Sequence, residues 1–433
     1  MIDSILHFLA QNAFWIITIV KIALLLFIVL TVNAYLTWFE RKLVAHIQAR
    51  WGPHRVGPHG LLQPAADGLK FLFKEDPTPA GVDKFVYYLA PFLALALSLT
   101  ALAVIPFGPD PLPFSVLGQK VYLWISNPDI GLLILFSITA LSVYGIALAG
   151  WASNNKYSLL GGLRSSAQMI SYELALTMSV VGVLLMANTF SLTEIIKAQA
   201  NAKHGITILG WNIISWTHQG LYWPQIIGFI CFFTAAIAET NRAPFDLPEA
   251  ESELVAGFHT EYASFKFAMF FIAEYTAMIT VSCLATILFF GGWLSPFPDT
   301  PFFYFTHFIP SITLIPFGLW VIYDGIKYET IWGRLVLPVI GFAMFAIGAA
   351  LLAGAWVAPL HAVNEFIQPV FWFTSKVFVF LFFYVWARGT LPRLRYDQLM
   401  NVGWKLLLPV SIGNVIITAG VILLREYLRG HHS

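Results

Sequence analysis

Long apolar runs alternate with short polar connections along the whole chain of 433 residues. A helix needs about 20 apolar residues to cross the hydrocarbon core of a bilayer. Ten runs approach or exceed this length: 14–38, 85–106, 130–151, 166–188, 222–240, 262–291, 302–323, 335–358, 366–387 and 404–425. The pattern predicts an all-α polytopic membrane protein, built as one integral-membrane domain over residues 1–433.

Basic residues indicate the orientation of these spans, because Lys and Arg gather in the connections on the inner side of a membrane. If the chain begins outside, sixteen Lys and Arg fall in inner segments and five in outer ones. Both termini are therefore predicted to face the periplasm. Pro310 and Pro316 interrupt the run 302–323. A span is nevertheless needed there to keep the basic segment 388–405 inside, so 302–358 is predicted to be a helical hairpin.

Composition narrows the chemistry that the chain can carry. Hydrophobic residues make up 58% of it and charged residues 11%, against about 45–50% and about 25% in soluble domains. The net charge of +1 argues against a nucleic-acid partner. Cys231 and Cys283 form no CxxC pair, so no iron–sulfur cluster or other metal site is predicted. No GxGxxG or GxxxxGKS/T motif is present, so no nucleotide site is predicted.

The segment 239–275 carries a high density of acids beside strongly apolar runs. It holds seven of the 23 acidic residues: Glu239, Asp246, Glu249, Glu251, Glu253, Glu261 and Glu274. A carboxylate in such surroundings is costly unless it is protonated, paired or next to internal water. These acids are therefore candidates for a functional role. The alternative is a solvated loop between two spans. This alternative suits Glu249, Glu251 and Glu253 better than Glu239, Glu261 and Glu274, which adjoin or lie within apolar runs.

The inner connection 40–84 begins with Glu40 and Arg41 at the end of the first span. Its GPHRVGPHG stretch has Gly or Pro at five of nine positions, which predicts a loop with defined turns. Apolar residues in 61–74 recur at i, i+3, i+4 spacing and predict a short amphipathic helix on the membrane surface. This helix is either a doorway for a lipid-soluble ligand or a plain surface anchor. Further along, 151–164 is expected to be a polar link with a hinge at Gly162.

Two ionisable residues lie deep in apolar runs. Glu173 lies midway into AQMISYELALTMSVVGVLLM and is a candidate proton carrier. Lys376 lies in FWFTSKVFVFLFF, where it could pair with one of the acids or titrate by itself. The sequence leaves these two alternatives open.

Four segments together resemble one family, the H subunit of the proton-pumping NADH–quinone oxidoreductase (respiratory complex I). They are ERKLVAHIQARWGPHRVGPHGLLQPAADGLKFLFKED (40–76), GWASNNKYSLLGGLRSSAQMISYELAL (150–176), ETNRAPFDLPEAESELVAGFHTEYASFKFAMFFIAEY (239–275) and RGTLPRLRYDQLMNVGWK (388–405). The family usually has eight spans, so the hairpin 302–358 is expected to be an insertion into that core. The outer connections 107–129 and 189–221 also look enlarged, and His54 and His59 stand where the family has other residues.

The resemblance implies a role for each candidate residue. The quinone chamber and its entrance would be lined or supported by Glu40, Arg41, Arg50, Asp67 and Glu75. The inner connection 239–261 would form an acidic loop against the soluble arm, with Arg242, Asp246, Glu249, Glu251 and Glu253. A proton path would contain Glu173, Glu239, Glu261 and Glu274, and Arg388 and Arg393 would face the junction of the two arms.

The resemblance also implies cofactors and partners. Quinone would be the substrate, whereas NADH, FMN and the iron–sulfur clusters would be bound by partner subunits. The size of the chain and the extra hairpin favour a bacterial inner membrane. Two alternatives remain at this point: the membrane anchor of an energy-converting hydrogenase, and a free-standing ion or solute transporter. Internal repeats with broken helices are frequent in transporters, and the sequence shows none.

Overall fold

The computed structural model describes residues 13–109, 111, 115–116, 119–200, 207–217, 220–246, 256–296, 308–328, 331–354 and 361–430. Within these residues, nine helices are long and apolar enough to cross a membrane. A further apolar helix, α9 (Ile226–Glu239), has only 14 residues. The predicted all-α polytopic architecture is confirmed, and the helix expected at 222–240 is shorter than predicted.

The elements follow the order of the predicted runs. The long helices are α2 (Ala13–Ile47), α4 (Lys84–Ala101), α5 (Gly131–Ala152), α6 (Lys156–Ala187), α11 (Ser264–Phe289), α12 (Ile309–Lys327), α13 (Ile331–Gly354), α14 (His361–Thr390) and α16 (Leu408–Gly430). The other helices are α3 (Gln63–Phe73), α7 (Leu192–Ala200), α8 (Thr207–Gly210) and α15 (Tyr396–Asn401), with 3₁₀ turns at Pro58–Gly60, Leu102–Val104 and Gly257–His259 and a π-helical turn at Val402–Leu407.

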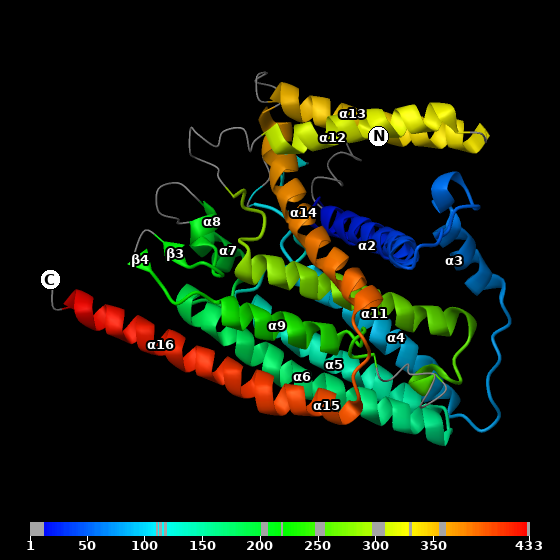
Figure 1. Cartoon of the computed structure of the whole chain (residues 1–433), viewed down its shortest axis with the longest axis horizontal. Coiled ribbons are helices and arrows are strands. Elements are labelled where there is room, and N and C mark those ends of the chain that lie inside the picture. The colour runs from blue at the N-terminus through cyan, green and yellow to red at the C-terminus, as the bar shows by residue number, and fades with distance from the viewer. Residues whose placement is uncertain are drawn as a thin grey trace.

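Two small antiparallel ribbons lie in the connections that were predicted to be outer. In the first, β1 (Ser115–Val116) pairs with β2 (Gln119–Lys120). In the second, β3 (Trp216–Thr217) pairs with β4 (Gly220–Leu221). Figure 1 shows β3, β4, α7 and α8 at the left end of the bundle, and α3 and the turn between α5 and α6 at the right. Connections predicted to share a side of the membrane therefore share an end of the bundle.

Helix α11 is the centre of the fold, because it is the most buried of the nine spans in the described chain. It contacts α2, α3, α4, α9 and α14. Four of its buried hydroxyl groups are accommodated within the helix itself. Thr276, Thr280, Ser282 and Thr286 each donate a hydrogen bond to the carbonyl four residues earlier, at 2.7–2.9 Å. The buried hydroxyl groups are thereby satisfied.

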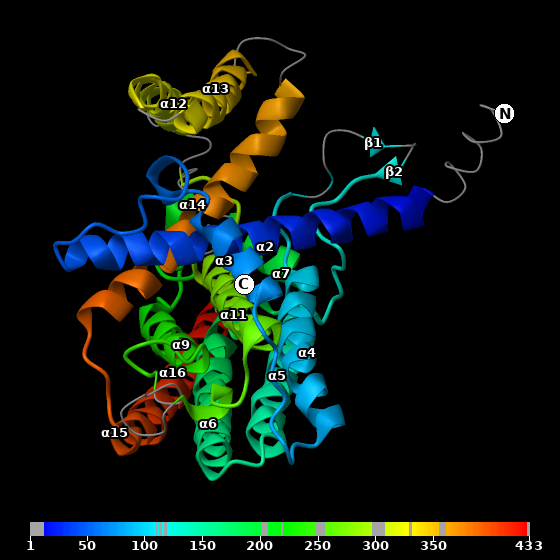
Figure 2. The ribbon, with the colours of Figure 1, turned by 90° about the vertical axis from the view of Figure 1, so that its right-hand side faces the viewer.

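Two predicted boundaries are wrong, and each has a physical reason. Helix α2 runs on to Ile47, so Glu40 and Arg41 lie within the helix rather than at its end. Figure 2 shows α2 lying across α4, α5 and α6, and such an inclined helix needs more residues than an upright one. Helix α6 begins at Lys156, where Asn155 caps it through Tyr157 N–H. Gly162 is no hinge, because an added Cβ would lie 3.1 Å from Gly150 Cα in the neighbouring helix.

The hairpin expected at 302–358 is present as α12 and α13, which pack against each other. Helix α12 begins at Ile309, and residues 301–307 lie outside the described part of the chain. Figure 2 shows the pair standing beside the main bundle, with α14 leading from it into the bundle.

Candidate functional site

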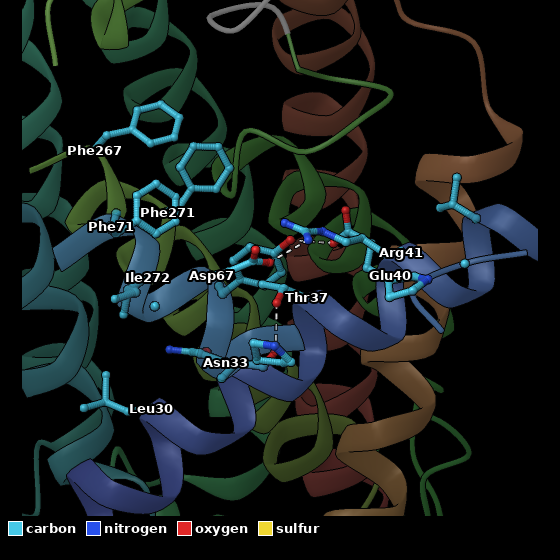
Figure 3. Close-up of a pocket in the computed structure, with 18 of the residues that line it drawn as sticks. Leu30, Asn33, Thr37, Glu40, Arg41, Asp67, Phe71, Phe267, Phe271 and Ile272 are labelled. Carbon is cyan, nitrogen blue, oxygen red and sulfur yellow. Dashed lines mark hydrogen bonds and ion pairs between the residues drawn. The ribbon is translucent and has the colours of Figure 1, made fainter. Parts of the chain in front are cut away.

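A cavity of about 970 Å³ lies between α2, α3 and α11. In Figure 3 the rings of Phe71, Phe267 and Phe271 lie to one side of the view, and Glu40 and Arg41 lie to the other. The apolar lining includes Leu30, Phe71, Phe265, Phe267, Phe271 and Ile272. The charged lining consists of Glu40, Arg41, Arg50, Asp67 and Arg388. Of the five residues predicted for the chamber, the structure thus brings four together here, and it leaves Glu75 exposed outside the cavity.

Helix α2 supplies the polar side of the cavity through a stripe on its buried face. Asn33, Thr37 and Glu40 follow at i, i+4 and i+7, which places them on one side of a helix. The amide of Asn33 donates a hydrogen bond of 2.8 Å to Thr276 Oγ1 on α11. Asn33 and Thr37 are absent from the predicted site, although their spacing ahead of Glu40 was a readable signal.

Helix α3 forms the opposite wall and is fixed at both of its ends. Near its start, Arg41 and Gln63 bond the two carboxylate oxygens of Asp67 at 2.7 and 3.1 Å. Beyond its end, Ser264 Oγ donates to the carbonyls of Phe71 and Lys74 at 2.7 and 3.1 Å. The apolar face of α3 remains exposed, which confirms the predicted amphipathic helix.

A balanced cluster of four charges lies behind the polar lining. The Glu40 carboxylate pairs with Arg388 and lies 3.8 Å from Arg242 Nη1. Arg242 in turn lies 3.7 Å from Glu274 Oε2, and its guanidinium stacks 4.2 Å above the ring of Tyr275. Tyr275 donates a hydrogen bond of 2.8 Å to Glu40 Oε2. Because Glu40 and Arg242 are almost fully buried, pairing of opposite charges is what makes these positions tolerable.

A second, much smaller cavity of about 50 Å³ continues from this cluster. It is lined by Glu274, Glu239 and Asn241 among others. Such a volume holds about one or two water molecules, given polar groups to bind them. Glu239 also lies within Coulombic range of Glu173 on α6. Three of the four acids predicted for the proton path are thereby connected in space to Glu40.

Aromatic side chains and a buried histidine back the apolar wall of the large cavity. The ring of His259 stacks on Phe271 at 5.8 Å and meets Phe267 edge-on at 5.3 Å. Burial lowers the pKa of His259 to about 3, so its ring is neutral at physiological pH. Burial likewise raises the pKa of Tyr262, which stacks on Tyr87 at 4.4 Å. The neutral ring of His259 therefore supports Phe267 and Phe271 in the cavity wall without adding charge.

The remaining predicted residues lie around this centre. Asp246 pairs with Arg393 at 3.3 Å, and Glu261 accepts a hydrogen bond of 2.7 Å from Asn155 away from both cavities. Glu249, Glu251 and Glu253 lie outside the described residues. Lys376 pairs with none of the predicted acids in the described chain and donates instead to three main-chain carbonyls. No group of three potential metal ligands occurs among the described residues.

Comparison with known proteins identifies the family of the chain. A family model described as NADH dehydrogenase matches residues 20–323 and 315–419. The first of the NADH-quinone oxidoreductase H subunits of Solibacter usitatus (strain Ellin6076) is 48% identical over 407 residues, which cover 94% of this chain and 97% of that protein. The second H subunit of Koribacter versatilis (strain Ellin345) is 45% identical, with coverage of 95% and 98%. The chain belongs to the family of NADH-quinone oxidoreductase H subunits.

Membership of this family makes the chain a multi-pass membrane subunit of a respiratory oxidoreductase complex. It confirms the family recognised in the sequence and sets aside the free-standing transporter. The two matched ranges overlap at 315–323, within α12 of the hairpin. The first matched range therefore ends, and the second begins, within the segment 302–358 where the insertion was expected.

Proposed function

We propose that the large cavity is the quinone-binding chamber of the complex and that α3 is its doorway. The observation that carries this proposal is the two-sided lining of the 970 Å³ cavity. Leu30, Phe71 and Phe271 suit the ring and isoprenoid tail of a quinone. Arg41, which Asp67 holds in place, can donate hydrogen bonds to its carbonyl oxygens. The exposed apolar face of α3 would let a lipid-soluble substrate approach from the bilayer.

Reduction of a quinone to a quinol takes two electrons and two protons. We propose that the electrons come from iron–sulfur clusters of partner subunits, which also hold the NADH and FMN sites. The relatives are named as NADH-quinone oxidoreductases, which supports this division of labour. This chain would supply the apolar chamber and groups that hold or move protons.

We further propose that Glu40, Glu274, Glu239 and Glu173 form a path for protons leading away from the chamber. Arg242 lies between Glu40 and Glu274 and would couple their charges without itself giving up a proton. The small cavity that Glu274 and Glu239 both line has room for water that could carry a proton between them. A charge change in the chamber would alter the protonation of nearby acids by Coulomb coupling, on the order of 1–4 kcal/mol at 4 Å. Asp246, Arg388 and Arg393 would then lie where this chain meets the soluble arm.

The same proposal covers topology and surroundings. The inner segments 40–84 and 239–261 would face the cytoplasm, and both termini would face the periplasm of a bacterial inner membrane. The alternation of helix ends in Figure 1 and the bias of Lys and Arg support this orientation. The hairpin 302–358 would be an insertion into an eight-helix core within one membrane domain.

Gly68 offers a direct test of the chamber. It lines the cavity from α3, and an added Cβ would meet no atom within 4 Å. Gly68→Phe in the purified complex should raise the KM for quinone at least about tenfold, since a ring would occupy space that the substrate needs. NADH oxidation by a water-soluble acceptor should stay unchanged.

Gly68→Ala is the matched control, because it removes the same glycine and adds only a methyl group. Ala favours the helix by about 1 kcal/mol over Gly, so this variant should keep the KM of the original protein. Equal KM values for the Phe and Ala variants would contradict the chamber.

A further inference from the structure

The turn of the hairpin contacts the loop that follows α2, far along the chain from the hairpin itself. In both Figure 1 and Figure 2 the blue loop after α2 lies beside the end of the hairpin. His59 Nε2 lies 2.7 Å from Asp324 Oδ2 on α12. The main-chain N–H of His59 donates to the hydroxyl of Tyr328 at 3.0 Å, and the two rings meet edge-on at 5.2 Å. Apart from this contact, the hairpin touches the described chain chiefly at α14.

His59 is held through its side chain and both of its main-chain polar groups. Its carbonyl accepts a hydrogen bond of 3.3 Å from Trp38 Nε1 on α2. A carboxylate can only accept, so the ring nitrogen is the donor to Asp324. The backbone of His59 is in the left-handed region, with a φ of 49°. A non-glycine residue stays in this region only where its surroundings fix it, and here Trp38 and the hairpin do so.

His59 is connected to the wall of the large cavity through its neighbour Gly60. Gly60, at a φ of 78°, packs so closely on the loop that an added Cβ would lie 2.4 Å from Pro53 O. Pro53, Gly52 and Trp51 line the cavity. Displacement of His59 would therefore be passed to the cavity wall through Gly60 and Pro53.

We infer that the hairpin α12–α13 is a brace for the mouth of the cavity. Asp324 and Tyr328 fix His59, and His59 fixes the segment 51–60 that forms part of the wall. The three residues are positioning residues for quinone entry and do not touch the substrate. The inference rests on the proposed function, since it takes quinone as the ligand of the cavity.

Amide hydrogen exchange in the purified complex tests the brace without reference to quinone. The amides of Gly60, Leu61 and Leu62 bond within the loop to Gly57, Pro58 and Val56. Tyr328→Phe removes the hydroxyl that accepts from the main chain of His59, and Asp324→Leu removes the carboxylate that accepts from its ring. Each should speed exchange of these three amides by about tenfold, the effect of one lost hydrogen bond.

Tyr323→Phe is the matched control on the same helix. Its hydroxyl accepts from Lys327, and its side chain is mostly exposed away from the loop. This variant should leave loop exchange unchanged. Unchanged exchange in both Tyr328→Phe and Asp324→Leu would overturn the brace, whatever their activity.

Quinone kinetics then test the positioning role. Tyr328→Phe and Asp324→Leu should raise the KM for quinone about three- to tenfold with little change in kcat, whereas Asp324→Glu, which keeps a carboxylate, should raise it less. If exchange rises and KM stays constant while Gly68→Phe raises it, the brace has no role in entry. If no variant, including Gly68→Phe, alters KM, the proposed chamber itself fails and the positioning role fails with it.

Discussion

At the scale of single residues, Glu239 tests whether protons pass along the small cavity, because its carboxyl group lines that cavity. Glu239→Gln keeps the size of the side chain and removes its exchangeable acid. Because Glu239 lies between Glu173 and the cavity shared with Glu274, proton translocation by the reconstituted complex should slow at least about tenfold. NADH oxidation by a water-soluble acceptor should continue. The measurement is acidification of proteoliposomes per NADH oxidised.

Glu194→Gln is the control for that substitution. Glu194 is exposed on α7 and pairs with Lys197 at 3.2 Å, away from both cavities. It should pump as the original protein does. Full translocation in Glu239→Gln would remove this residue from the path.

The residues of the site were only partly readable in the sequence. Glu40 and Asp67 were predicted from the resemblance of the segment 40–76 to the family, and both line the large cavity. Tyr275 was missed, since its partner Glu40 is 235 positions away and nothing in the chain shows that they meet. Glu75 was predicted from the same resemblance, yet it lies beyond the end of α3 and is exposed.

At the scale of the elements, Lys376 joins α14 to the turn that ends α11. Its ammonium donates to the carbonyls of Phe290, Gly292 and Leu294 at 2.7–2.9 Å and lies 4.4 Å above the ring of Trp211. Lys376→Met should destabilise the assembled complex by about 2–4 kcal/mol, because charge-assisted hydrogen bonds to buried carbonyls are lost. The midpoint of thermal unfolding measures this loss.

Thr374→Val, two residues earlier on the exposed side of α14, serves as the comparison. It should change stability by less than about 0.5 kcal/mol. A Lys376→Met complex that is as stable as this control, yet fails to pump, would assign Lys376 to proton transfer instead of to the helix contact.

Element boundaries were predictable where a change in polarity marks them, and wrong where it does not. The amphipathic segment was placed to within two residues, since its polar flanks and apolar face coincide with α3. The start of α6 was misplaced because WASNNKYSLLGGLR reads as polar, whereas Gly161 and Gly162 serve close packing against Gly257 and Gly150. Helix contacts of this kind leave no periodic signal in a single sequence.

At the scale of the whole molecule, we predict on which side of the membrane each helix end lies. Successive spans run in alternating directions, so their ends alternate between the two ends of the bundle. The two native thiols are buried, Cys231 at 2% exposure and Cys283 at 1%, so an introduced cysteine can be labelled over a low background. Lys156 begins α6, Lys327 ends α12, and Glu426 lies near the end of α16. All three are exposed.

A membrane-impermeant thiol reagent should label Lys156→Cys and Lys327→Cys several-fold more in inverted vesicles than in intact cells, and Glu426→Cys the other way round. The reason is the charge bias, which places the basic connections inside, together with the odd number of spans that separates Lys327 from Glu426. Labelling of Lys327→Cys from the same side as Glu426→Cys would mean that the hairpin does not span. Its turn would then lie on the wrong side to reach His59, and the brace would fail along with the predicted topology.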